Sequence, residues 1–324
     1  MASIDPFVKC LFSALTGPKS ARSLSVFIFH RVLNSPDPLF PGEVDIAAFD
    51  EMLDWIGGAF NVMPLTTGLD ALNAGTLPTR AAAITFDDGY ADNLTNAAPL
   101  LKAHGMSATF FIATGFLDGG IMFNDMIIES VRRTPHEALS LEALGLAHLP
   151  VNTTEDKRRA IDAILDKVKF LPQAQRAEAA ALVRDRASVE LPTDLMLTST
   201  ELIRLRDCGM EIGAHTMTHP ILTRVSAAVA KAEIENGRDR LEELLEERIR
   251  VFAYPNGKRG RDYSDEHVTM VRDAGFDYAM STDWGVARQG TDLFQLPRFT
   301  PWDRSRLRFS ARLAGNVLSR SQSN

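Results

Sequence analysis

Residues 81–93 read AAAITFDDGYADN, and this stretch predicts a strand, a tight turn and a helix in direct succession. Residues 81–86 are an apolar run of strand length. Two adjacent carboxylates follow at once, and Gly89 then allows the backbone to turn. We expect Asp92 to cap a helix over residues 93–104, because a short side-chain oxygen can accept an unpaired amide hydrogen at a helix start.

The two carboxylates, Asp87 and Asp88, stand where this strand ends. In sheets and barrels whose parallel strands are joined by helices, ligands and catalytic groups gather at the carboxyl ends of the strands. Neighbouring residues of a strand point to opposite sides of the backbone, so the two side chains suit separate roles, one holding a metal and the other transferring protons. A solvated turn is the alternative, since Asp-Gly pairs are common in turns.

At 324 residues and 45% hydrophobic content, the chain can bury a substantial core, as one large domain or two smaller ones. Its formal net charge of −7 argues against a protein that binds nucleic acid through a general phosphate-binding surface. Basic residues nevertheless gather after Pro297, where six arginines accompany a single carboxylate, Asp303. A solvated last helix explains this basic end, and peripheral contact with an anionic membrane or substrate is the alternative.

The two cysteines, Cys10 and Cys208, predict no disulfide framework and allow a reducing compartment. The first residues lack a basic segment, and Lys9 interrupts the short apolar run at 7–15, which makes a poor secretory signal. No apolar segment reaches the length of about 20 residues that a membrane span needs. We therefore expect a cytoplasmic location, with peripheral membrane contact through one of the ends left open.

Short apolar runs alternate with helical patterns along most of the chain. The expected strands are residues 25–30, 61–65, 81–86, 107–113, 211–215, 250–254, 278–282 and 294–299. This alternation predicts an α/β fold with a mainly parallel sheet of about seven to eight strands, closed into a barrel. A doubly wound open sheet is the competitor, but the glycine fingerprint of a dinucleotide-binding fold is missing.

The pattern changes in residues 119–199, which are mainly helical and charged. Amphipathic helices are expected at 161–168 and 173–186. A segment of this length is too long for an ordinary connection and predicts an insertion. We thus expect one domain over residues 1–324, with this insertion inside it and a basic C-terminal helix or tail at 303–324.

A second cluster of candidate site residues is the pair His215 and His219, at the end of another expected strand. Pro220 disfavours the α conformation at His219, so we expect a loop here. Two imidazoles and one carboxylate from another strand end make a three-ligand metal site with open positions. Such a site acidifies a water and polarises a carbonyl. Non-haem iron oxygenases use the same donor set, although they have no need of a second adjacent aspartate.

Three motifs occur in a telling order: residues 85–89 (TFDDG), 215–220 (HTMTHP) and 252–257 (FAYPNG). In this order they resemble the polysaccharide deacetylases, metal-dependent carbohydrate esterases that share the NodB-homology domain. The resemblance covers about residues 24–118 and 199–300. It implies a distorted (β/α) barrel and the hydrolysis of an N-acetyl group on a carbohydrate, with release of acetate and a free amino sugar.

The resemblance also implies roles for individual residues. By position, Asp87 is similar to the catalytic base of the family. Asp88, His215 and His219 are similar to its metal ligands. Tyr254 is similar to the residue whose backbone N–H helps to hold the oxyanion. The implied cofactor is a divalent metal ion, most simply Zn, although Co, Ni and Mn suit the same donors.

The chain departs from the family at its C-terminal motif. Many members supply an acid histidine from a Leu-x-His motif there, but residues 296–298 read Leu-Pro-Arg. His30 ends the first expected strand and could protonate the leaving amine instead, which resembles the branch that includes poly-N-acetylglucosamine deacetylases. A plain buried histidine is the alternative. Arg298 would then orient Asp87 through its planar fork. Trp284 is expected either to stack on a sugar ring or to pack in the ordinary way.

The partner that this resemblance implies is an N-acetylated sugar, an oligosaccharide or a lipid-linked glycan, and not a nucleic acid. Two alternatives remain open at this point. One is hydrolysis of another non-peptide C–N bond on the same fold, and the other is a non-catalytic carbohydrate-binding or assembly protein.

Overall fold

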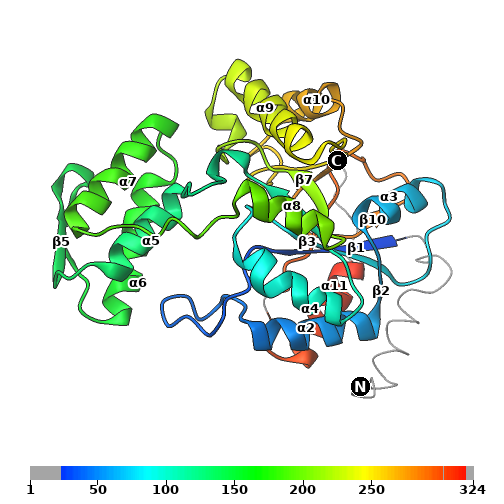
Figure 1. Cartoon of the computed structure of the whole chain (residues 1–324), viewed down its shortest axis with the longest axis horizontal. Helices are drawn as coiled ribbons and strands as arrows, with labels where there is room; N and C mark the ends of the chain where they lie inside the picture. The colour runs from blue at the N-terminus through cyan, green and yellow to red at the C-terminus, as the bar shows by residue number, and fades with distance from the viewer. Residues whose placement is uncertain (1–22, 302, 319–324) are drawn as a thin grey trace.

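An eight-stranded, mainly parallel sheet lies at the centre of the computed structural model, which describes residues 23–301 and 303–318 (Figure 1). The strand order is β10-β1-β3-β4-β7-β8-β9, with β2 paired to β3 and only β10 antiparallel to its neighbour. The strands are β1 (Ser23–Phe29), β2 (Asn61–Val62), β3 (Ala81–Phe86), β4 (Thr109–Ile112), β7 (Glu211–Ala214), β8 (Val251–Ala253), β9 (Tyr278–Met280) and β10 (Ala287–Arg288).

The two sides of this sheet are bridged by the segment that follows β10. Leu296 forms a parallel bridge to β9, and Phe299 forms one to β1. The sheet is therefore curled into a distorted (β/α) barrel, as predicted, and is not an open doubly wound sheet. The strand expected at 294–299 is wrong as a regular strand. Its backbone bonds first to one neighbour and then to the other, and Pro297 has no N–H for a ladder.

Strands β1 and β3 are buried on both faces, which explains their near-continuous apolar sequences. Alternate side chains of these strands join two different hydrophobic clusters. Ile84 and Phe86 pack with the surrounding helices, whereas Val26 and Ala83 belong to the cluster inside the curled sheet. Asp87 lies an even number of residues after Ala83, so its side chain is on the same inward face. The carboxylate therefore lies at the end of the barrel interior.

Helices surround the barrel and bury one apolar face each. The first of them buries Phe49, Met52 and Ile56, which lie on one face. The surrounding helices are α2 (Ile46–Ala59), α3 (Leu65–Asn73), α4 (Ala98–Ala103), α8 (Ser199–Asp207), α9 (Ala227–Leu245), α10 (Asp265–Asp273) and α11 (Arg306–Leu318).

The cap expected at Asp92 is wrong. Asp92 is itself helical, with φ −66° and ψ −13°, and a π-helical turn, Asn93–Ala97, separates it from α4. Its carboxylate instead accepts hydrogen bonds from the Nε of Arg31 (2.8 Å) and the backbone N–H of Val32 (3.2 Å). A competing tertiary partner has therefore taken the side chain away from the helix start, and the loop after β1 is tied to the strand–turn–helix unit.

Residues between β4 and α8 form a group of elements at one side of the barrel (Figure 1). They pack around a separate apolar cluster that includes Ile127, Leu139, Ile161 and Val183. Two of the elements form a hairpin that the helical sequence pattern did not predict. The elements are α5 (Phe123–Arg133), β5 (Ala138–Leu141), β6 (Leu146–Pro150), α6 (Thr154–Val168) and α7 (Gln173–Ala187).

Targeting predictions for residues 1–22 lie outside the described residues, as do Cys10 and Arg320. Within residues 23–301 and 303–318, no helix has the length and apolar character that crossing a membrane requires.

Gly213 of β7 shows how tightly the barrel interior is packed. A Cβ atom here would lie 2.5 Å from Cδ1 of Phe111 and 2.9 Å from Cγ2 of Val251. We predict that Gly213→Ala lowers the free energy of unfolding by about 1–3 kcal/mol through overpacking. The control is Gly42→Ala, since nothing lies within 4 Å of a Cβ there. Urea unfolding measures both, and equal midpoints for the two variants would contradict the packing account.

Candidate functional site

Three potential metal ligands come together where β3 and β7 end. One ligand atom from each of Asp88, His215 and His219 lies within 4.8 Å of the others. The Asp88 Oδ1 is 3.6 Å from the Nε2 of His215 and 3.5 Å from the Nε2 of His219. This Oδ1 is buried and has no hydrogen-bond partner in the described part of the chain. A buried carboxylate oxygen needs a partner, so this atom fits the role of a ligand to a cation.

The Nε2 atoms of both imidazoles lie near the Asp88 carboxylate. The Nδ1 of His215 lies 2.7 Å from the carbonyl oxygen of Ala253. Because a carbonyl can only accept, Nδ1 carries the proton and Nε2 keeps its lone pair. Burial lowers the pKa of His219 to about 4, against the opposing attraction of Asp88. The His219 ring is therefore neutral near pH 7, which is the state that binds a metal ion.

The spacing of these atoms fits a divalent metal ion. Two ligands that each lie about 2.0–2.2 Å from a tetrahedral ion are about 3.3–3.6 Å apart. The distances from Asp88 to the two histidines, 3.6 Å and 3.5 Å, are within this interval. The three side chains can therefore hold an ion and leave a further coordination position open.

The backbone around this cluster adopts conformations that side chains normally avoid. Asp88 (φ 78°), Thr216 (φ 65°), His219 (φ 52°) and Asn256 (φ 60°) are four of the eight non-glycine residues with positive φ in the described chain. Such strain concentrates at functional sites, where the surrounding structure imposes it. The loop expected at the second histidine is confirmed, because β7 ends at Ala214 and His219 is not α-helical.

Glu233 of α9 supports the loop between the two histidines, and the sequence reading missed it. Its Oε2 accepts hydrogen bonds from the backbone N–H groups of Met217 (3.0 Å) and Thr218 (2.8 Å), and its Oε1 accepts one from the Thr218 hydroxyl (2.6 Å). Glu233 is buried. A single carboxylate thus fixes the backbone that carries both imidazoles.

Asp87 and Arg298 form a buried two-point ion pair beside the metal cluster. The guanidinium nitrogens donate to the two carboxylate oxygens at 2.6 and 2.8 Å. Asp87 also lies 3.9 Å from the Nε2 of His215. Burial alone would raise the pKa of Asp87, but Arg298 and His215 outweigh it and lower that pKa to about 2. The structure therefore brings Arg298 to Asp87 and keeps the carboxylate ionised.

His30 lies at the same rim of the barrel. It follows β1 directly and its side chain is exposed, so the alternative of a plain buried histidine is wrong. Its carbonyl oxygen accepts a hydrogen bond from the Nδ2 of Asn93 (2.9 Å), which fixes the backbone there. The charge of His30 acts on the pKa of both Asp87 and His219, which places the imidazole in electrostatic reach of the cluster.

Tyr254 does not fit the oxyanion role that the resemblance implies. Its backbone N–H donates to the carbonyl of Met280 (3.1 Å) in the ladder between β8 and β9. Its hydroxyl donates to the carbonyl of Phe294 (3.1 Å), and its ring stacks on Tyr263 with centroids 3.9 Å apart. Tyr254 is thus a core residue whose N–H is already used.

Asn256 is better placed for that role, and the sequence reading did not single it out. It lines the same pocket as Asp88 and His219. Its backbone N–H forms no hydrogen bond with the described residues. An N–H on this left-handed turn is therefore available to a ligand beside the cluster.

Trp284 packs against the end of the chain. The Arg312 guanidinium lies 4.9 Å from its ring centroid, and Phe299 meets it edge-on at 5.7 Å. Its side chain is still 48% exposed. The packing interpretation accounts for these contacts, and stacking on a sugar remains a prediction.

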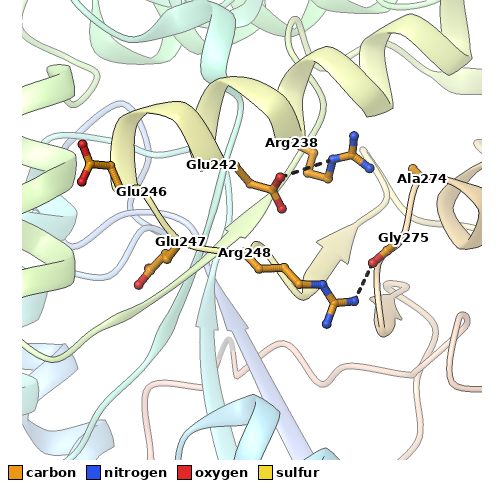
Figure 2. Close-up of a pocket in the computed structure, with 7 residues that line it drawn as sticks. All are labelled: Arg238, Glu242, Glu246, Glu247, Arg248, Ala274 and Gly275. Carbon is orange, nitrogen blue, oxygen red and sulfur yellow. Dashed lines mark hydrogen bonds and ion pairs between the residues drawn. The ribbon is translucent and has the colours of Figure 1, made fainter.

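Two cavities of useful size differ sharply in chemistry. The one at the cluster has a volume of about 350 Å³, with Asp88, His219 and Asn256 on one side and residues of α6 and α7 on the other. The larger, about 580 Å³, lies before the amino ends of β8 and β9, at the opposite edge of the sheet. Figure 2 shows that three of its charged side chains already have partners: Arg238 pairs with Glu242, and Arg248 donates to the carbonyl of Gly275. The smaller cavity is therefore the candidate active site.

Known proteins share the sequence pattern and the fold of this chain. The sequence profile of the polysaccharide deacetylase family matches residues 74–279, well over half of the chain. The YxkH protein of Bacillus subtilis (strain 168), whose name places it among the polysaccharide deacetylases, is 18% identical over 288 residues, which cover 88% of this chain and 74% of YxkH.

Solved structures share the fold. The deacetylase PplD from Streptococcus pyogenes, in complex with acetate, superposes with a TM-score of 0.57 at 18% identity, covering 86% of this chain and 92% of PplD. IcaB from Ammonifex degensii gives a TM-score of 0.59 at 17% identity, covering 89% of this chain and 96% of IcaB. These likenesses confirm the predicted fold. The family match leads to one conclusion: this chain belongs to the polysaccharide deacetylase family and is a carbohydrate N-deacetylase.

Proposed function

We propose that the chain removes the acetyl group from an N-acetylated glycan with Asp87 as general base, His30 as general acid, and a zinc ion held by Asp88 and the two histidines. The observation that carries this proposal is the contrast between the two adjacent aspartates. Asp87 has both oxygens held by Arg298, whereas the buried Oδ1 of Asp88 has no partner within the described residues. The Asp87 carboxylate is thus oriented by the arginine, and the Asp88 carboxylate is available to bind a cation.

One carboxylate and two imidazoles favour zinc, although Co, Ni and Mn suit the same donors. A divalent ion bound here supplies Lewis acidity toward the attacking water and the acetyl carbonyl. The ligands Asp88, His215 and His219 are all on rigid strand ends or on the loop that Glu233 holds, so the site is preorganised.

Asp87 accepts the proton of the attacking water. Arg298 holds its carboxylate in one orientation, and the lowered pKa keeps it ionised throughout the neutral range. The backbone N–H of Asn256 lines the same pocket and donates to the oxyanion as the acetyl carbon becomes tetrahedral. The oxyanion of the acetyl group is thus stabilised by a backbone N–H that does not have to move during the reaction.

His30 donates a proton to the departing amine. An amine anion cannot leave at neutral pH, so amide hydrolysis requires such an acid. The exposed imidazole stands at the open rim, where the sugar nitrogen leaves, and the Asn93 hydrogen bond fixes its backbone.

An early-strand acid histidine supports a glycan substrate of the poly-N-acetylglucosamine kind, in polymeric or lipid-linked form. Location in the cytoplasm, with peripheral contact to a membrane, remains a prediction from the sequence. The two alternatives that the sequence left open were hydrolysis of another C–N bond and non-catalytic sugar binding. Acetate release from N-acetylated oligosaccharides by the zinc-reconstituted protein tests them. Sugar binding without acetate release under several metals would favour the non-catalytic function.

Separate substitutions of the proposed base and of a proposed metal ligand distinguish the two roles. We predict that Asp87→Asn lowers kcat by about 10²- to 10⁴-fold while zinc content stays near one per chain, because the base is lost and the ligands remain. His215→Ala should lose the zinc itself. Acetate release and metal analysis measure both effects, with Asp265→Asn, an exposed aspartate of α10, as the control. Full activity in Asp87→Asn would rule out its role as base.

The acid role of His30 predicts a dependence on the leaving group. We expect His30→Ala to lower the hydrolysis of N-acetylglucosamine oligomers by about 10²- to 10⁴-fold. Hydrolysis of 4-nitrophenyl acetate should barely change, since a nitrophenolate leaves without protonation. His104→Ala is the matched control, because His104 pairs with Asp50 at the surface. An equal loss on both substrates would place the acid elsewhere.

Glu233 supports the loop that carries His219, so substituting it should change the affinity for zinc although no metal ligand is altered. We expect Glu233→Gln to weaken zinc binding by about 10- to 100-fold, because an amide cannot accept all three loop hydrogen bonds. Competition with a fluorescent chelator measures the affinity. Glu235→Gln serves as control, because Glu235 is on the same helix but pairs with Lys231. Unchanged affinity in Glu233→Gln would show that the loop holds its geometry unaided.

A further inference from the structure

Arg176, in the first turns of α7, is a buried cation without a carboxylate partner among the described residues. Its side chain is only 7% exposed, and its guanidinium lies over the ring of Phe123 at 4.3 Å from the centroid. Among the described residues it forms no ion pair and no side-chain hydrogen bond. Burial lowers its pKa, with no carboxylate to compensate.

An unpaired guanidinium in such a place is costly. Desolvating a charge is favourable only when a partner of opposite charge or several acceptors replace the water. Asp162 and Asp166 of α6 line the same cavity, but both are exposed and neither reaches ion-pair distance of Arg176 in the described structure. The stacking on Phe123 stabilises the ring-facing side of the guanidinium and leaves its N–H groups without acceptors.

The cavity that Arg176 lines is the one that contains the metal cluster. Asp88 and His219 line it from the barrel, and Arg176 lines it from α7. A narrow crevice continues from it, also lined by Arg176, together with Lys169 and Arg224, and without any carboxylate. Neither of these two flanking cations has an ion pair in the described chain. The charged side chains that line this crevice are therefore all positive.

The position of this crevice relative to the cluster is fixed by a direct contact. The Nε2 of Gln173, one turn before Arg176 on α7, donates to the hydroxyl of Thr218 at 2.6 Å. Thr218 belongs to the loop that carries His219, and Glu233 holds the same hydroxyl from behind. The buried cation and the metal ligands are thus parts of one connected structure.

We propose that Arg176, flanked by Lys169 and Arg224, binds an anionic group, a phosphate or a carboxylate, on the same glycan whose N-acetyl group meets the metal cluster. Among the glycans of the proposed function, this site selects those in which a phosphate or carboxylate accompanies the N-acetylated sugar over the neutral polymer. This inference rests on the proposed function. Binding of a free sugar amine to Asp162 and Asp166 is less favoured, because exposed carboxylates are already solvated and have no unmet need.

Three small probes test the proposal: N-acetylglucosamine 1-phosphate, N-acetylmuramic acid and the neutral methyl N-acetylglucosaminide. The zinc-loaded enzyme is expected to release acetate from one or both anionic probes with a kcat/KM about 10- to 100-fold above the neutral one. Arg176→Met should abolish that preference, mainly through KM, and Arg176→Lys should retain part of it. Arg184→Met, on the same helix but paired with Asp185, is the matched control.

The two anionic probes separate phosphate from carboxylate as the bound group. A wild-type enzyme without preference for either anion overturns the proposal. So does an equal loss on all three probes in Arg176→Met, because the arginine then serves the shared sugar or the fold. If Arg176→Met does not fold, the wild-type enzyme is compared with Arg176→Lys. Lysine keeps the charge but cannot donate two parallel hydrogen bonds to one anion.

Calorimetry on the metal-free protein distinguishes failure of this inference from failure of the proposed function. Binding of an anionic probe that is tighter than that of the neutral probe, and weakened in Arg176→Met, supports the anion site even if no acetate is released. Acetate release without any such difference in binding or in kcat/KM leaves the deacetylase standing and overturns the anion site.

Discussion

The ion pair between Arg298 and Asp87 is the interaction on which the rest of the structure depends. Both side chains are almost completely buried, so their attraction must offset the loss of two hydration shells. The guanidinium meets this demand because its Nε also donates to the carbonyl of Ser281 and a terminal nitrogen donates to the hydroxyl of Thr85. Removing one partner of such a pair costs about 3–5 kcal/mol. Arg298 also lies in the segment that bridges β9 and β1, so barrel closure and carboxylate orientation are one event.

Sequence reasoning succeeded where a feature depends on local pattern. Apolar runs such as 81–86 predicted the buried strands, since a strand covered on both faces has no polar alternation to obscure it. The ligand cluster was also accessible, because Asp88 and His215 directly follow strands and parallel strands bring their carboxyl ends to one edge. Even the arginine at 298 could be associated with Asp87, because a buried strand-end cation needs a carboxylate.

Sequence reasoning failed where a distant partner decides the outcome. Asp92 reads as a helix cap until Arg31, 61 residues away, takes its carboxylate. Tyr254 looks available until the ladder with β9 uses its N–H, and nothing near Asn256 in the chain reveals that its own N–H stays free. Glu233 and Arg176 are each one of several charged residues on a long helix. For such residues, exposure to solvent is the ordinary expectation. Only the packing of those helices shows that both are buried.

The bridge that residues 296–299 form between β9 and β1 has a consequence for the synthesis of the protein on the ribosome. Asp87 and Arg298 are 211 residues apart, so a nascent chain displays its base long before the ribosome delivers the arginine that aligns it. Until then the carboxylate sits at the end of an unclosed sheet, open to water. Hydrolytic competence therefore requires translation to pass residue 298, and products that end before it lack the arginine that aligns the base. The appearance of activity in a synthesis reaction would report completion of the barrel rather than the arrival of its ligands.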